Sequence, residues 1–275
     1  MKFVHISDLH IGEHATRNQL AVKLVDKILK RYASQREKPL LLITGDFVHD
    51  GQQDQYQMAE KVLFRLHNAG FPILMCPGNH DYGKTGLSDD YNSRKLYNEF
   101  AMKLTTRKSD SHPGAQNVHN GQWNYPLVNR FDDYYFIGLD TMQGVFSLSW
   151  YARLWQSFTA AGWLGASQLT KLDAVIKQIR QQSPNATIIL YMHHHPFQFS
   201  FRFRAMQLHD RNRLHSMIAN KIDILLFGHN HVEKRLDQEQ RKHGIDVVQV
   251  FGTSTHSSGV PFYEVDAKTK RLQRF

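Results

Sequence analysis

Short apolar runs alternate with amphipathic stretches through the first 80 residues of the chain. Runs rich in Val, Ile, Leu and Phe lie at residues 2–7, 40–44 and 71–76, and each is typical of a buried strand. Residues 17–32 and 53–68 instead place apolar side chains three and four positions apart, which is helical spacing. Strand, helix and strand at these lengths predict right-handed parallel crossovers in an α/β fold.

The same rules predict further elements in the rest of the chain. They indicate helices at residues 93–104, 168–182 and 211–220, strands at residues 134–139, 187–192 and 222–227, and closing antiparallel strands within residues 246–266. Thr16 fits the N-cap of the first helix, and Gly70 fits the end of the second. Residues 82–129 are otherwise polar and irregular. We expect one domain over residues 1–275.

Two aromatic segments depart from this alternation. Aromatic side chains crowd residues 142–162, which we interpret as a lid-like insertion. Phe alternates with polar residues over residues 197–203, so one face of that segment is apolar. Either segment could pack on the core or form a lid over the sheet edge, and the sequence leaves both interpretations open.

Composition and charge narrow the class of protein. The 275 residues are 41% hydrophobic and 21% charged, as in ordinary globular proteins. A single cysteine, Cys76, excludes an internal disulfide, and the first residues lack the pattern of a secretory signal, so we expect a cytoplasmic protein. No apolar stretch reaches the ~18 residues of a membrane span. The net charge of +9 fits a nucleic acid, anionic lipid or phosphate-bearing partner, or merely a basic surface.

Polar residues with metal-binding side chains follow five of the predicted strands. They are Asp8 and His10, Asp46, Asn79 and His80, His193 to His195, and His229 and His231. Parallel strands bring such loops to a common edge of the sheet. Each motif alone is common by chance, but five of them at strand ends indicate a shared site. Nitrogen and oxygen ligands without a thiolate suit two transition ions of the Mn, Fe or Zn type and do not choose among them.

These motifs in this order resemble the calcineurin-like metallophosphoesterase family. The segments that carry the resemblance are Asp8-x-His10, Gly45-Asp46 with Gly51, Gly78-Asn79-His80-Asp81, His194-x-Pro196 and Gly228-His229-x-His231. The resemblance implies a four-layer α-β-β-α sandwich with two mixed β-sheets and a dinuclear metal site at the C-terminal edge of the strands.

The resemblance also implies roles for individual residues. Asp8, His10 and His231 would bind one metal ion, Asn79, His194 and His229 would bind the other, and Asp46 would bridge the two. His80 would act outside the ligand set on the phosphate or leaving group, Asn79 would help to stabilise charge, and Asp81 would orient His80 from behind.

The three consecutive histidines are distinguished by strand alternation. His193 and His195 would face one way and His194 the other. The family spacing, a ligand two positions before Pro196, selects His194. We expect His193 to cap the strand or to hydrogen-bond a ligand, and His195 to contact phosphate or to be a bystander.

One departure from the family bears on the substrate. His49-Asp50 precede Gly51, where the protein phosphatase branch has Asp-Arg, so the chain is more similar to the cyclic-nucleotide and glycerophosphodiester phosphodiesterases. The resemblance therefore implies in-line attack on a small phosphodiester, or a phosphomonoester, by a hydroxide held between two metal ions. A DNA or RNA nuclease and a non-catalytic scaffold are the alternatives, and the substrate, the metals and the oligomeric state stay open.

Overall fold

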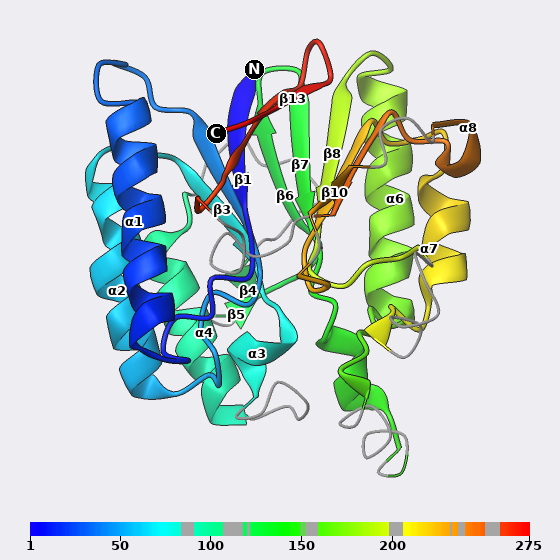
Figure 1. Cartoon of the computed structure of the whole chain (residues 1–275). Helices are drawn as coiled ribbons and strands as arrows, with labels where there is room; N and C mark the ends of the chain where they lie inside the picture. Colours follow the sequence, from blue (N-terminus) through cyan, green and yellow to red (C-terminus); the bar gives the residue numbers. More distant parts are fainter. Residues whose placement is uncertain are drawn as a thin grey trace.

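The protein folds into two facing β-sheets enclosed by helices (Figure 1). This computed structural model describes residues 1–83, 91–106, 118–119, 122–149, 151, 159–197, 206–231, 233–235, 240–250 and 259–275. One helical layer covers each sheet on its outer side, which gives the four-layer α-β-β-α sandwich that the sequence predicts.

The first sheet holds the N-terminal half of the α/β pattern. Its strand order is β13-β12-β1-β2-β3. The bounds are β1 Lys2–Ile6, β2 Leu40–Thr44, β3 Ile73–Cys76, β12 Tyr263–Asp266 and β13 Arg271–Arg274. β1, β2 and β3 are parallel, as predicted, whereas β12 joins β1 in antiparallel orientation.

The second sheet has the strand order β10-β11-β9-β8-β7-β6. The bounds are β6 Leu127–Phe131, β7 Tyr134–Gly138, β8 Thr187–Tyr191, β9 Ile224–Phe227, β10 Lys234–Arg235 and β11 Val247–Val250. The four central strands are parallel, and antiparallel β6 and β10 form the edges. A separate hairpin pairs β4 Val118–His119 with β5 Gln122–Trp123.

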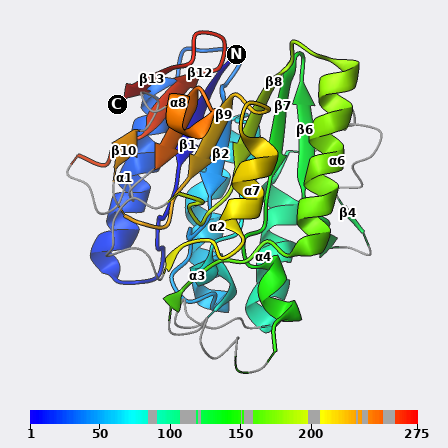
Figure 2. The same cartoon turned by 90° about the vertical axis from the view of Figure 1, so that its right-hand side faces the viewer.

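The helices lie on the outer faces of the sheets. Those beside the first sheet are α1 Ala15–Arg31, α2 Gln53–Asn68 and α4 Tyr91–Leu104, and those beside the second are α6 Ala166–Gln182 and α7 Arg211–Ile218 (Figure 2). The described residues also include three short helices: α3 Asn79–Tyr82, η1 Gln143–Ser147 and α8 Gln240–His243. No helix in the described ranges is both long and apolar enough to cross a membrane.

Each sheet is apolar on both faces because it is covered on both sides. In β1, Val4 packs toward the helices while its neighbour Phe3 packs against the second sheet. The layer between the sheets joins side chains such as Leu42 from β2 with Phe136 and Ile189 from β7 and β8. Continuous apolar strands, rather than alternating ones, are the expected consequence of such double burial.

The structure corrects several expectations about the elements. His14, not Thr16, caps α1, because its Nδ1 accepts a hydrogen bond from the Arg17 backbone N–H at 3.2 Å. β11 is parallel to β9, so the closing strands are only partly antiparallel. The predicted irregular region contains the regular strand β6. In the aromatic segments, residues 150, 152–158 and 198–205 lie outside the described part of the chain, so the lid interpretation stays a prediction.

Candidate metal centre

The loops after five parallel strands carry the predicted ligands, and several of these loops have an unusual backbone. Ten described non-glycine residues have positive φ angles, and half of them are predicted ligands, namely Asp8, His10, Asp46, His229 and His231. Non-glycine residues adopt this conformation at a cost, and such residues concentrate at functional sites. The backbone thus points to the same loops as the motifs, on independent grounds.

Asp8, His10 and His231 form the first cluster of potential ligands. Their donor atoms lie within 4.8 Å of one another. His10 Nε2 lies 3.1 Å from His231 Nε2, and His231 Nε2 lies 3.7 Å from Asp8 Oδ1. The backbone N–H of His229 donates to Asp8 at 3.0 Å, which ties the first sheet to the loop after β9. This is the set that the sequence analysis expects for one metal ion.

Asp46 lies between this cluster and the next. Asp8, Asp46 and His193 place their donor atoms within 4.8 Å, and His193 Nε2 is 3.0 Å from Asp46 Oδ2. The other carboxylate oxygen, Oδ1, accepts a hydrogen bond from the His80 backbone N–H at 2.9 Å. Asp46 therefore contacts both halves of the site, in the position expected of a bridge.

Burial and charge set the protonation of these buried groups. Burial raises the pKa of Asp8 to about 7, and the neighbouring Asp46 carboxylate adds to the effect. Burial alone would also raise the pKa of Asp46, but His193 and His80 outweigh it and hold that pKa well below its usual range. A bound cation would favour the charged form of both carboxylates.

His193, His194 and His229 form the third group, again within 4.8 Å. His193 Nε2 is 3.1 Å from His229 Nδ1. His193 Nδ1 is 2.8 Å from the Thr44 carbonyl oxygen, to which it must donate because a carbonyl only accepts. Although burial opposes it, the Asp46 carboxylate raises the pKa of His193 to about 9, so Nε2 is protonated and donates to Asp46 Oδ2 at 3.0 Å. Loss of that proton would leave the Nε2 lone pair directed at Asp46 and His229.

His194 is engaged differently from the expectation. Its Nε2 lies 3.1 Å from the Ala160 carbonyl oxygen, and its Nδ1 lies 2.6 Å from the Thr141 hydroxyl. Neutral His194 can donate to the first and accept from the second, which occupies both ring nitrogens. Both His194 nitrogens are thus engaged in the described structure, whereas His193 Nε2 faces Asp46, and the assignment of His194 as a ligand stays a prediction. His195 is buried and its Nδ1 lies 2.6 Å from the Phe197 carbonyl oxygen, so it faces its own loop.

The Asn79-His80-Asp81 motif forms the short helix α3 at the end of β3. Asn79 is buried, whereas His80 is partly exposed and its Nδ1 donates to the His49 carbonyl oxygen at 2.5 Å. The Asp81 carboxylate does not contact the His80 ring. It accepts from the backbone N–H groups of Asp46, Phe47, Val48 and Gly78 at 2.8–3.2 Å. Asp81 thus holds the loop of Asp46, and the described structure shows no hydrogen bond between its carboxylate and the His80 ring that it was expected to orient.

Two glycines in the motifs make room for the carboxylates. A Cβ atom on Gly78 would collide with Asp46 Oδ1, and one on Gly228 would collide with Asp8 Oδ2 and with the Ser7 hydroxyl. The site therefore needs glycine at both positions to bring three loops together.

The donor set fits two transition ions. The buried Nε2 of His229 has no hydrogen-bond partner among the described residues. Two pairs of imidazole nitrogens meet at 3.1 Å beside carboxylate oxygens. Neutral imidazoles and carboxylates converging on one point are the ligands that Mn, Fe and Zn ions accept.

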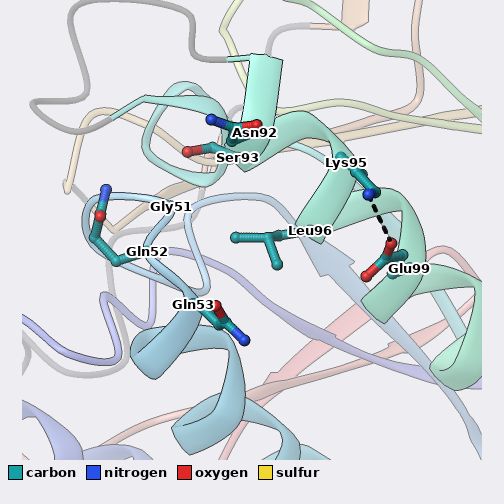
Figure 3. A pocket seen from close by; sticks show the side chains of 8 residues that line it. All are labelled: Gly51, Gln52, Gln53, Asn92, Ser93, Lys95, Leu96 and Glu99. Atoms are coloured by element: carbon teal, nitrogen blue, oxygen red, sulfur yellow. Dashed lines mark ion pairs between the residues drawn. The ribbon is translucent and has the colours of Figure 1, made fainter.

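One described cavity is separate from these clusters. It has a volume of about 500 Å³ and lies between the start of α2 and α4, as Figure 3 shows. Gly51 and Gln53 line one side, and Ser93 and Lys95 line the other, where Lys95 is 4.0 Å from Glu99. None of its lining residues belongs to the ligand clusters, so this cavity is a neighbour of the metal centre and not the centre itself.

Comparison with known proteins agrees with the geometry. A profile of the family described as calcineurin-like phosphoesterase matches residues 1–233. The chain belongs to the calcineurin-like phosphoesterase family. A probable cyclic nucleotide phosphodiesterase of Vesicomyosocius okutanii is 23% identical over 83% of this chain and 77% of that protein. A 3',5'-cyclic-nucleotide phosphodiesterase of Nostoc is also 23% identical, over 86% of this chain and 73% of that protein.

Two further similarities are more limited. The glycerophosphodiester phosphodiesterase GpdQ of Enterobacter lignolyticus is 30% identical, but the match spans only 38% of this chain and 42% of that enzyme. A solved structure of GAP50, the anchor in the inner membrane complex of Plasmodium, has a TM-score of 0.56 at 12% identity and covers all of this chain and 87% of that one. The latter similarity concerns the fold alone.

Sequence reasoning missed His49 as part of the site. His49 Nδ1 lies 3.4 Å from His10 Nδ1, its ring stacks on that of His80 with centroids 5.2 Å apart, and His10, His49 and His80 form a further cluster within 4.8 Å. The sequence carried a signal, because His49 stands where the protein phosphatase branch has Asp, but that difference served only to exclude the protein phosphatases.

Proposed function

We propose that this protein is a metal-dependent phosphodiesterase that hydrolyses a small-molecule diester, such as a cyclic nucleotide or a glycerophosphodiester. The observation that carries the proposal is the pair of His/Asp clusters that meet at Asp46, with the partly exposed His80 beside them. The named activities of the cyclic-nucleotide and glycerophosphodiester relatives support this substrate class.

The ligand assignment is part of this proposal. Asp8, His10 and His231 would hold one ion, Asn79, His193 and His229 would hold the second, and Asp46 would contribute to both. His193 takes the place predicted for His194 because its Nε2 faces Asp46, whereas both His194 nitrogens are bonded elsewhere. When bound, Mn, Fe or Zn ions supply Lewis acidity toward the phosphate and toward water.

We assign proton transfer and the positioning of the site to side chains and backbone groups of the protein. The His49 carbonyl fixes Nδ1–H of His80, so Nε2 is the atom of His80 that holds or releases a proton. We assign to that nitrogen the protonation of the leaving alkoxide. The His80 backbone N–H also binds Asp46, which couples the position of the acid to the position of the bridge. Asp81 keeps the Asp46 loop in its strained conformation through three backbone hydrogen bonds.

The test is turnover of a substrate panel by protein reconstituted with Mn, Fe or Zn. The panel contains bis-p-nitrophenyl phosphate, p-nitrophenyl phosphate, cyclic AMP, a glycerophosphodiester and single-stranded DNA. The proposal predicts metal-dependent hydrolysis of small diesters in preference to the monoester. Hydrolysis confined to single-stranded DNA would favour the nuclease alternative, and no turnover with any metal would overturn the proposal.

A further inference from the structure

A polar side chain crosses the otherwise apolar layer between the two sheets. His5 of β1 is completely buried, and its alternation with Phe3 directs it toward the second sheet. Its Nδ1 lies 3.1 Å from Oε1 of Gln249 on β11, and its Nε2 lies 2.9 Å from Oγ1 of Thr44 on β2. One imidazole therefore links three strands from both sheets.

The two contacts define a single hydrogen-bond direction. If Nδ1–H donates to the Gln249 amide oxygen, then Nε2 of neutral His5 accepts from the Thr44 hydroxyl. Burial lowers the pKa of His5 to about 4, which keeps the ring neutral as this arrangement requires. An aliphatic side chain would fill the same layer, so packing alone does not explain a histidine here.

Thr44 connects His5 to the metal centre. Its carbonyl oxygen accepts from the Ser7 hydroxyl at 2.9 Å and from His193 Nδ1 at 2.8 Å. Thr44 is also the last residue of β2, directly before Gly45 with φ 82° and Asp46 with φ 52°. The surroundings must hold this left-handed turn in place, because Asp46 adopts it at a cost.

We propose that His5 is a positioning residue that anchors Thr44 and thereby fixes both the direction of Asp46 and the ring of His193. This inference rests on the proposed metal site and adds a support to it. Through Gln249, the same anchor ties β11 of the second sheet to the turn that carries the bridging carboxylate. Groups that orient metal ligands from behind in this way affect metal affinity without touching the ion.

The test is calorimetric titration of metal-free protein with Mn²⁺, using a pair of variants at Thr44. Thr44→Val removes the hydroxyl at nearly constant shape, and we expect Mn²⁺ affinity to fall ~10–100-fold, the range for groups behind a metal ligand. Thr44→Ser keeps the hydroxyl, so its affinity should stay near that of the wild type. His5→Leu should lower the affinity similarly, and the double variant should be no worse than His5→Leu because the two groups act in series.

Two controls distinguish a positioning role of His5 and Thr44 from a general loss of protein stability. Ile43→Val trims a buried neighbour of Thr44 on the helix-facing side of β2, and its Mn²⁺ affinity should be unchanged. The free energy of unfolding of each metal-free variant is measured in urea beside the titration. Unchanged affinity in Thr44→Val and His5→Leu, or equal loss in Thr44→Ser, would overturn the inference. A wild-type protein that binds no Mn²⁺, Fe or Zn would instead overturn the proposed function.

Discussion

Asp46 presents one carboxylate oxygen to His80 and the other to His193. Asp46→Asn keeps the shape but replaces one oxygen with a donor that cannot bridge two cations. We expect most of the diesterase activity and about one metal equivalent to be lost. Asp50→Asn in the same loop is the control, since the Asp50 carboxylate pairs with His49, at 3.9 Å, and with none of the predicted metal ligands among the described residues. Metal analysis by mass spectrometry and a circular dichroism spectrum measure the two effects, and full metal content with full activity in Asp46→Asn would contradict the bridge.

His80 lies outside the ligand clusters that contain Asp46, at the partly exposed side of the site. His80→Ala should lower kcat by ~10²–10⁴, the range for general acid–base groups. Its metal content should stay nearly unchanged, because the ring donates to a backbone carbonyl. Steady-state kinetics and metal analysis on the same preparation check this. If metal and activity fall together, His80 is itself a ligand.

The sequence and the structure favour different metal ligands: the sequence favours His194, and the structure favours His193. The structure favours His193→Ala losing one metal ion and nearly all activity, with His194→Ala keeping both ions and losing stability instead, because Thr141 and Ala160 lose their partner. Metal stoichiometry and urea unfolding of the two variants decide between them. Retention of both ions in His193→Ala would restore His194 as the ligand.

Strand alternation could not place these histidines, for a physical reason. β8 ends at Tyr191, so the period-two rule no longer applies at His193, where the chain bends. Asp8, His10 and Asp46 were placed correctly in their loops from the sequence, but nothing in the sequence shows that they need positive φ angles. The role of Asp81 could not be predicted either, because three of its four partners are backbone groups of another loop.

The elements themselves were largely predictable where burial is continuous. β2 and α2 begin and end where the apolar pattern begins and ends. The single turn of α3 is too short to show a period, and β13 carries mostly exposed side chains. Contacts with neighbouring segments stabilise both elements. Asp81 of α3 accepts a hydrogen bond from the Asp46 loop, and β13 pairs with β12 at the sheet edge.

Asp223, just before β9, forms hydrogen bonds with residues of α6, of β8 and of the segment before β13. Its Oδ2 accepts from the Ile188 backbone N–H and from Arg180, both at 2.9 Å, and its Oδ1 accepts from Lys270 at 3.1 Å. Burial alone would raise the pKa of Asp223, but these donors outweigh burial and lower it. A carboxyl whose pKa is lowered on folding stabilises the protein above its ordinary pKa and loses that effect as the pH falls.

Asp223→Asn should therefore lower the free energy of unfolding by about 1–2 kcal/mol at neutral pH. The difference from the wild type should shrink as the pH falls below about 4, the ordinary pKa of an aspartate. Urea unfolding at a series of pH values measures this. Asp173→Asn is the control, because its ion pairs with Lys177 and Lys221 are at the surface and should contribute little. A difference that is constant with pH would contradict the account.

At the scale of the whole molecule, the proposed ligands come from both sheets. Asp8, His10, Asp46 and Asn79 follow strands of the first sheet, and His193, His229 and His231 follow strands of the second. Bound ions would therefore cross-link the two sheets and stabilise the fold as one unit. At a free metal concentration 100-fold above Kd, the expected gain is about 2.7 kcal/mol in the free energy of unfolding. Urea unfolding with and without Mn²⁺ checks this, and Asp46→Asn should show a smaller gain. An equal gain in that variant would place the stabilising ion elsewhere.

The most direct test of the account is metal stoichiometry joined to activity. Metal-free wild-type protein is titrated with Mn²⁺, Fe²⁺ or Zn²⁺ while hydrolysis of bis-p-nitrophenyl phosphate is followed in the same samples. The account predicts that activity appears as about two equivalents of metal bind per chain, as a dinuclear site requires. Binding of less than about half an equivalent of the three metals combined, with no activation by any of them, would contradict the dinuclear phosphodiesterase centre.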